Sequence, residues 1–137
     1  MQLLLAQTPV RPLYGQVEIG DPAVKGYPQF ETGNERAVAL PQRIAVATRG
    51  DRDGDVAIEV WKEGAHADSL CDAVLVHEGV LVVSGSSLEV GNTVGNELHR
   101  FAIGVGKHLV AIYTKPSVGE ADTVIFLLDP KSEKNLE

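Results

Sequence analysis

Apolar and polar residues alternate along much of the chain with a repeat of two. The pattern is clearest in segments 43–49 and 55–61, where Ile44 and Val46, and then Val56, Ile58 and Val60, stand at alternate positions. Such a repeat is typical of a β-strand that buries one face. Residues 50–54, Gly-Asp-Arg-Asp-Gly, separate the two segments and are rich in turn formers. The pattern predicts an antiparallel hairpin with a loop of about five residues.

Further short segments show the same alternation, and turn-forming residues separate them about every ten positions. No segment sustains the 3.6-residue repeat of a helix, and no crossover helix joins two strands. The sequence therefore predicts an all-β, single-domain antiparallel β-sandwich of about 8–10 short strands. Residues 20–42 are expected to form mainly a long irregular connection. Strands are expected at residues 2–6, 14–19, 37–40, 43–49, 55–61, 73–76, 79–83, 88–90, 98–103, 108–114 and 123–129.

Composition agrees with a sheet protein. The 137 residues include 18 valines and 6 isoleucines, and 44% of the chain is hydrophobic. Side chains branched at Cβ suit a pleated surface, and this apolar content excludes a disordered chain. We expect one domain over residues 1–130, followed by a polar C-terminal tail at 131–137. The single cysteine allows no internal disulfide, and the N-terminus has no basic region of a secretion signal, so a cytoplasmic location is expected.

Negative charge is concentrated in one part of the chain. The net charge is −7, and residues 51–78 hold eight acidic residues against two basic ones. Clustered lysines and arginines, which nucleic acids and anionic membranes require, are lacking, so neither is an expected partner. A basic protein partner fits this charge. Exposed edge strands also make a homodimer a further expectation.

The predicted hairpin provides the candidate contact surface. Its acidic tip would face a basic partner, and Trp61 would lie on a half-polar face as an interface anchor, or would simply pack over an adjacent loop. The loop at residues 62–72 would extend this surface. The predicted partner-binding residues are Arg49, Asp51, Arg52, Asp53, Asp55, Glu59, Trp61 and Glu63.

Calcium binding is an alternative function for the same acidic residues. Asp51, Asp53 and Asp55 alternate in a loop, and carboxylate oxygens are the ligands that Ca²⁺ prefers. Their spacing is not that of an EF-hand, which needs glycine at its sixth position and glutamate at its twelfth. A cation site would therefore need acids from a second loop, and Asp68 and Asp72 are the candidates.

A small enzyme with Cys71 as nucleophile is the second alternative. His66 or His77 would act as its base, although the neighbouring Asp72 disfavours the thiolate. No dinucleotide fingerprint, phosphate-binding loop or other cofactor motif occurs, so no cofactor is expected. The motif scan favours a binding protein over an enzyme.

Three stretches carry a family resemblance. They are RIAVATRGDRDGDVAIEVW at 43–61, LHRFAIGVGKHLVAIYT at 98–114 and DTVIFLLD at 122–129. Over residues 40–130 their strand and turn rhythm resembles small bacterial β-sandwich proteins, the inhibitor of the competence DNA-entry nuclease and immunity-type proteins. The resemblance implies a β-sandwich without catalysis that binds a protein, as an inhibitor or immunity-type protein for a nuclease or toxin. The first 40 residues do not contribute to it.

Overall fold

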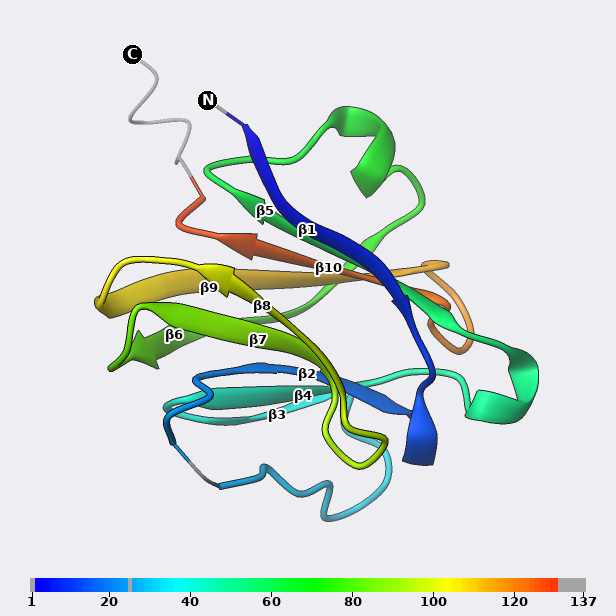
Figure 1. Ribbon diagram of the computed structural model, residues 1–137. Coiled ribbons are helices and arrows are strands. Elements are labelled where there is room, and N and C mark those ends of the chain that lie inside the picture. The colour runs from blue at the N-terminus through cyan, green and yellow to red at the C-terminus, as the bar shows by residue number, and fades with distance from the viewer. Residues whose placement is uncertain (1, 25, 131–137) are drawn as a thin grey trace.

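The computed structural model describes residues 2–24 and 26–130 (Figure 1), so the predicted tail at 131–137 lies outside the described residues. The described chain forms ten strands and three short 3-10 turns, and the predicted all-β class is confirmed. None of its helical turns is long and apolar enough to cross a membrane. The elements are β1 (Leu3–Val10), η1 (Leu13–Gly15), β2 (Gln16–Gly20), β3 (Ala37–Leu40), β4 (Arg43–Ala47), η2 (Asp51–Asp53), β5 (Val56–Lys62), η3 (Ala67–Leu70), β6 (Val74–Val83), β7 (Ser87–Asn92), β8 (Glu97–Ala102), β9 (Gly106–Lys115) and β10 (Thr123–Leu128).

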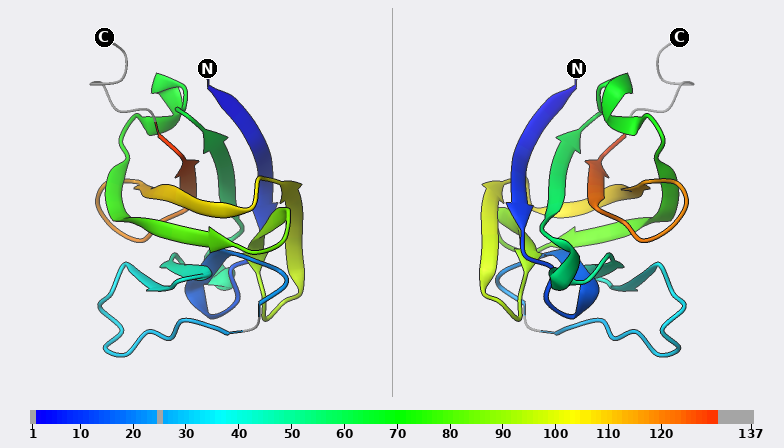
Figure 2. Two further views of the ribbon diagram at one scale, coloured as in Figure 1. Left: turned by 90° about the vertical axis from the view of Figure 1, so that its left-hand side faces the viewer. Right: turned by 90° about the vertical axis from the view of Figure 1, so that its right-hand side faces the viewer.

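The strands build two five-stranded sheets that pack face to face (Figures 1 and 2). Sheet A has the order β1-β5-β10-β9-β6, and sheet B has the order β3-β4-β2-β7-β8. Among the described strands all pairings are antiparallel except that of β5 with β10, which is parallel. The predicted sandwich is therefore correct, with one parallel pair at its centre.

Branched aliphatic side chains from both sheets fill the space between them. Their alternation along each strand turns one face inward, where burial of apolar surface stabilises the fold by about 25 cal/mol per Å². The two strands expected at 73–76 and 79–83 are one long strand, β6. Its pairing with β9 continues through a register shift between Leu75 and His77. Fully buried members of the core include Val17, Ile19, Ile44, Ile58, Leu81, Leu88, Ile112 and Phe126.

The predicted hairpin between segments 43–49 and 55–61 is wrong. Both segments are strands, but β4 lies between β3 and β2 in sheet B, whereas β5 lies between β1 and β10 in sheet A. The turn η2 crosses from one sheet to the other at an end of the sandwich (Figure 1). Alternation shows which face of a strand is buried, but it does not say which strand lies beside it.

Each sheet has an outer face that a connecting segment covers. On sheet A, residues 63–73 cross from β5 to β6 and lie over an apolar cluster built around Trp61. On sheet B, the connection between β2 and β3 carries Tyr27, whose ring centroid lies 5.8 Å from Cζ of the buried Arg43. These two covers are the two longest connections between the described strands.

Arg43 is the centre of a buried ionic cluster on the outer face of sheet B. Its Nη2 donates to Glu89 Oε2 at 2.5 Å, and its Nη1 lies 3.4 Å from Glu18 Oε1. All three side chains are buried, with Arg43 only 4% exposed. Gly20 makes room for the guanidinium, because a Cβ at this position would lie 2.7 Å from Arg43 Cζ.

Candidate functional site

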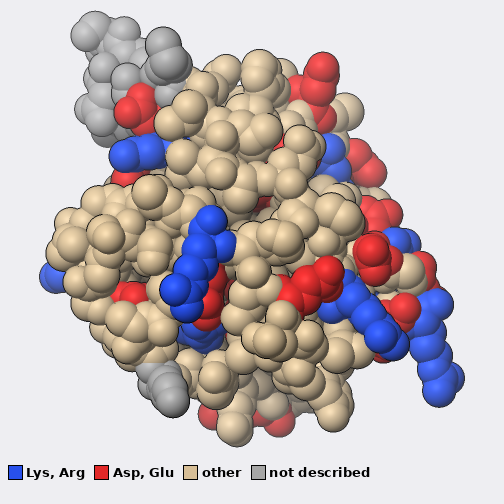
Figure 3. All heavy atoms as spheres, viewed as in Figure 1, with Lys and Arg blue, Asp and Glu red and all other residues tan. Residues whose placement is uncertain are grey.

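The turn η2 and its neighbours form an acidic end of the sandwich. Backbone bonds hold η2 against the loop between β9 and β10, since Arg49 N donates to Ala121 O at 2.9 Å and Ala57 N to Asp122 O at 3.0 Å. Figure 3 shows charged side chains gathered along the edge of the molecule where η2 lies. We define the acidic end by its carboxylates and arginines, which are Asp51, Asp53, Asp55, Glu97, Glu120, Asp122, Arg11, Arg49 and Arg52.

The arginines of this end neutralise only part of its charge. Arg11 Nη2 pairs with Asp51 Oδ2 at 3.2 Å, and the Arg11 amide donates to Glu97 Oε1 at 2.7 Å. Arg49 folds beneath η2, where its Nη2 donates to the Asp55 carbonyl oxygen. Arg49 therefore braces the loop while staying half-buried, and its contact with a partner remains a prediction.

Three predicted contact residues remain exposed at this end. Arg52, Asp53 and Asp55 project into solvent, and within the described chain the carboxylates of Asp53 and Asp55 make no hydrogen bond or ion pair. Backbone bonds of η2 fix the tip, since Asp53 N donates to Gly50 O and Gly54 N to Asp51 O. The end thus presents two uncommitted carboxylates on an ordered turn.

Trp61 is not an exposed anchor, and this part of the prediction is wrong. Only 5% of the residue is exposed, because Ala65 and Leu70 of the covering segment pack over it. Its Nε1 donates to Glu59 Oε1 at 2.8 Å, and the ring of His66 meets its ring edge-on at 4.9 Å. Ala111, Ile125 and Leu127 of the neighbouring strands surround Trp61 with apolar surface, so it belongs to a second hydrophobic core. This agrees with the alternative that Trp61 packs against an adjacent loop.

Glu59 and Glu63 do not join the acidic end. Glu59 holds the indole of Trp61, and Glu63 follows the opposite end of β5, where its amide donates to Leu128 O at 2.9 Å. The strand β5 separates Glu63 from η2 by seven residues, or about 23 Å at 3.3 Å per residue. The charge that is continuous along the sequence is therefore divided between different surfaces.

The proposed calcium ligands are not brought together. Figures 1 and 2 show η2, which carries Asp51 and Asp53, well apart from η3, which carries Asp68. Asp72 accepts a hydrogen bond from Ser117 Oγ at 2.8 Å instead. Across residues 2–24 and 26–130 no group of three or more His, Cys, Asp or Glu side chains is arranged to hold a metal ion. The calcium alternative therefore has no site in this part of the chain.

Cys71 is likewise not part of a catalytic pair. Its thiol is free and exposed, and in the described chain it forms no hydrogen bond with either candidate base. His66 packs against Trp61, and burial lowers the pKa of His77. The structure thus gives the thiol no base and no orienting group.

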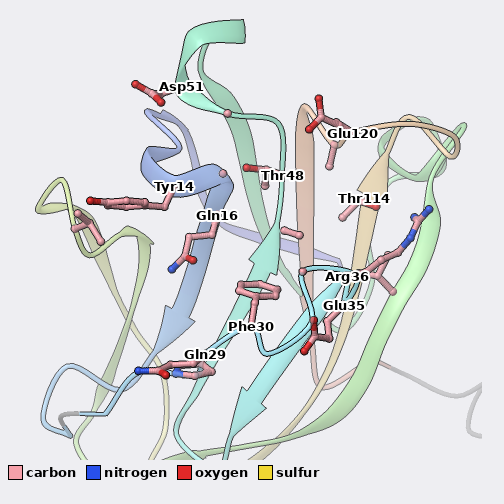
Figure 4. A pocket seen from close by; sticks show the side chains of 18 of the residues that line it. Tyr14, Gln16, Gln29, Phe30, Glu35, Arg36, Thr48, Asp51, Thr114 and Glu120 are labelled. Carbon is pink, nitrogen blue, oxygen red and sulfur yellow. The ribbon is translucent and has the colours of Figure 1, made fainter.

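A cleft beside the acidic end was not predicted from the sequence. It has a volume of about 1240 Å³ and opens between the two sheets where their edges diverge (Figure 4). Thr48 and Thr114, both buried, lie at its floor with Ala121. Four segments distant in sequence supply the lining, 14–16, 27–36, 47–51 and 114–121, together with Val76 and Val94.

Carboxylates and aromatic rings surround this cleft. Asp51, Glu120 and Glu35 line it with Arg36, and Tyr14 and Phe30 supply apolar surface. The Thr32 hydroxyl and the amides of Glu31 and Thr32 donate to the Glu35 carboxylate and lower the pKa of Glu35 to about 2. Glu35 is therefore ionised near neutral pH, and the cleft has a net negative lining.

A scan against protein-family models finds no match, and a search of curated proteins finds none either. The fold does match solved structures. ComJ from Bacillus subtilis, described as an inhibitor of the DNA-degrading activity of NucA, aligns with a TM-score of 0.67 over 93% of this chain and 97% of ComJ, at 14% identity. The chain has a ComJ-like fold.

A second solved structure that this chain matches is the protein described as crocagin biosynthetic gene J. It aligns with a TM-score of 0.62 and 13% identity, over 96% of this chain and 99% of its own. Both alignments span nearly the whole of each protein, and at this coverage they must include most of the first 40 residues, which added nothing to the sequence resemblance. The resemblance noted from the strand rhythm is confirmed at the level of fold.

Proposed function

We propose that this protein is a non-catalytic binding module that inhibits a basic protein, a DNA-degrading enzyme or a toxin, by covering its surface. The observation that carries the proposal is the likeness to ComJ, which extends over nearly the full length of both chains. An inhibitor of this kind needs no catalytic constellation, only a rigid surface that complements its target.

The acidic end is the surface that fits such a target. Enzymes that act on DNA bind phosphates through clustered lysines and arginines. Six carboxylates against three arginines give the acidic end a negative charge, and Asp53 and Asp55 are free to pair with a partner. Complementary charge steers two proteins together and raises their association rate.

Rigidity of the acidic end favours tight binding. The end stands on a core of buried valines and isoleucines, and backbone bonds from Arg49 and Ala57 tie η2 to the neighbouring loop. A preorganised surface loses less conformational entropy when it binds. The contact surface that we propose is therefore Arg52, Asp53 and Asp55, with Glu120 beside them.

The test is capture of the partner from the native cell, followed by an activity assay. The captured protein is identified, and its degradation of DNA or its toxicity is measured with and without the purified inhibitor. The double variant Asp53→Asn, Asp55→Asn is expected to slow association about tenfold at low salt. The double variant Asp68→Asn, Glu78→Gln changes the net charge equally at exposed positions outside the acidic end, and it serves as the control.

Capture of a basic enzyme whose activity falls on binding, with slower association only for the Asp53 and Asp55 variant, supports the proposal. Equal association of both double variants removes the acidic end from the interface. Unimpaired activity of the captured protein in the complex contradicts inhibition itself.

A further inference from the structure

We propose that the cleft beside the acidic end receives an arginine-bearing loop of the protein partner. The inference rests on the proposed function and names what the partner must insert. It follows from three properties of the cleft: its volume, a hydroxyl group without a partner at its floor, and a negatively charged rim.

The volume favours a peptide segment over a small ligand. Pockets for small molecules typically enclose about 300–1,000 Å³. This cleft is larger, at about 1240 Å³, and it opens widely to solvent beside η2. A protruding loop of a protein fits such a space, and the acidic end would contact the surface around that loop.

Thr114 provides the polar contact at the floor. Its residue is only 4% exposed and lines the cleft, yet its hydroxyl has no hydrogen-bond partner in the described part of the chain. The neighbouring Thr48 is different, because its Oγ1 donates to the Arg49 carbonyl oxygen at 2.9 Å. Among the described residues the fully buried side-chain atoms without a partner are Arg43 Nε and Arg49 Nε, so Thr114 Oγ1 is open to the cleft. A ligand that donates a hydrogen bond can therefore reach it and replace water there.

The rim selects a cationic donor. Glu120 lines the cleft, is exposed, and makes no ion pair with any described residue, whereas Asp51 is already paired with Arg11. Glu35 adds a second negative charge, which its low pKa maintains. A cation that enters from the partner therefore meets Glu120 as its free counter-ion.

The apolar walls favour arginine as that cation. Tyr14, Phe30 and Val76 offer surface for the aliphatic stem of a long side chain, and a planar guanidinium stacks on aromatic rings. Tyr27, which also lines the cleft, already has the guanidinium of Arg43 over its ring, with Cζ 5.8 Å from the ring centroid. An arginine can thus place its stem against the walls and its head between Glu120 and Thr114.

The experiment uses a capped pentapeptide, acetyl-Gly-Ser-Arg-Ser-Gly-amide, titrated into the ¹⁵N-labelled chain of 137 residues. Amide signals of residues 114 and 119–121 are expected to shift with saturation in the millimolar range. The same peptide with citrulline, a neutral isostere of arginine, is expected to bind at least about fivefold more weakly, since it lacks the charge. Glu120→Gln and Thr114→Val should each weaken the arginine peptide about three- to tenfold, whereas Asp68→Asn, on the outer face of sheet A, should leave it unchanged.

Absence of cleft shifts up to about 10 mM peptide, or equal shifts with citrulline, overturns the inference. The same variants are then tested in the complex with the captured enzyme. If Glu120→Gln and Thr114→Val leave that affinity unchanged while Asp53→Asn, Asp55→Asn weakens it, the inserted arginine is wrong and the proposed function stands. If the protein inhibits no partner at all, the proposed function fails, whatever the peptide shows.

Discussion

The outer faces of the two sheets are covered in chemically opposite ways. On sheet A the segment 63–73 seals an apolar cluster around Trp61. On sheet B the connection between β2 and β3 lies over charges, with Arg43 between Glu18 and Glu89. Apolar cover is tolerant of small shifts, whereas buried charges are stable only while every partner stays in place. The comparison indicates that the connection over sheet B depends on a few precise contacts.

Loss of Arg43 should have the largest effect on stability. Arg43→Met removes the cation and leaves Glu18 and Glu89 buried with like charges, which we expect to lower the free energy of unfolding by about 4 kcal/mol. Urea denaturation measures this change. Arg100→Met is the matched control: Arg100 also faces Glu89 but is 69% exposed, so its loss should cost less than about 1 kcal/mol. Similar costs for both variants would contradict the buried role of Arg43.

Truncation of Trp61 should have the second largest effect on stability, and this effect should be confined to the cover of sheet A. Trp61→Ala leaves a cavity beneath the covering segment, and we expect a loss of about 3 kcal/mol. Hydrogen exchange should quicken in residues 63–73 and remain unchanged in the connection over sheet B. The control Tyr14→Ala removes an aromatic side chain that is 82% exposed and should stay within about 0.5 kcal/mol of the parent. Uniform loss of protection in both covers would show that they are not independent.

Asp21 fastens the start of the connection over sheet B, and its contribution should depend on pH. Burial alone would raise the pKa of Asp21, but donation from the Ser84 amide and hydroxyl, each at 2.7 Å, and from the Ala23 amide outweighs burial and lowers it. The stabilisation is therefore complete above the unfolded-state value of 3.8 and is lost as the pH falls through the lower folded-state pKa.

We expect Asp21→Asn to lower the free energy of unfolding by about 2 kcal/mol at pH 7, because hydrogen bonds to a charged group are lost. Denaturation at a series of pH values should show the gap between the two proteins closing below pH 3.8. Ser86→Ala, in the same turn, is a control without contact to Asp21. A gap that stays constant down to pH 2 would exclude the ionised carboxylate as its source.

The smallest effect is expected at Glu35, in the exposed part of the same connection. An NMR titration of its carboxyl carbon should give a midpoint of about 2. Thr32→Val removes the hydroxyl that donates to Glu35 Oε1 at 2.7 Å and should move the midpoint toward 4.5. A normal midpoint in the parent protein would mean that these bonds do not persist in solution.

The sequence contains enough information to place the strands, because alternation is a local property. Alternation predicts a segment at each of the ten strands. The one difference in number is that β6 is predicted as two segments, which meet at its register shift. Which strands pair is not local: β5 lies beside β1 and β10, which are far from it in sequence. The adjacent segments 43–49 and 55–61 therefore suggested a hairpin that does not exist.

The sequence predicts one part of the candidate site, the exposed acids of η2, and does not predict the other part, the cleft beside them. The acids of η2 stood out as a cluster, and Asp53 and Asp55 are indeed exposed. The cleft gave no signal, because Tyr14, Phe30, Thr48 and Thr114 come from separate segments with no common spacing. Trp61 was misjudged because its neighbours on the same strand, Ala57 and Glu59, are less apolar than those on β10, where Ile125 and Leu127 show that the outer face is buried too.

The parallel pairing of β5 with β10 also bears on how the chain is made. The strand β10 is the last element of the described chain, yet it is the middle strand of sheet A and separates β5 from β9. Sheet A cannot close until residue 128 has left the ribosome, because the pairs β1–β5 and β9–β6 are joined only through β10. Long-range pairing of this kind slows folding. Joining the two halves of sheet A is therefore a late step in the synthesis of this chain.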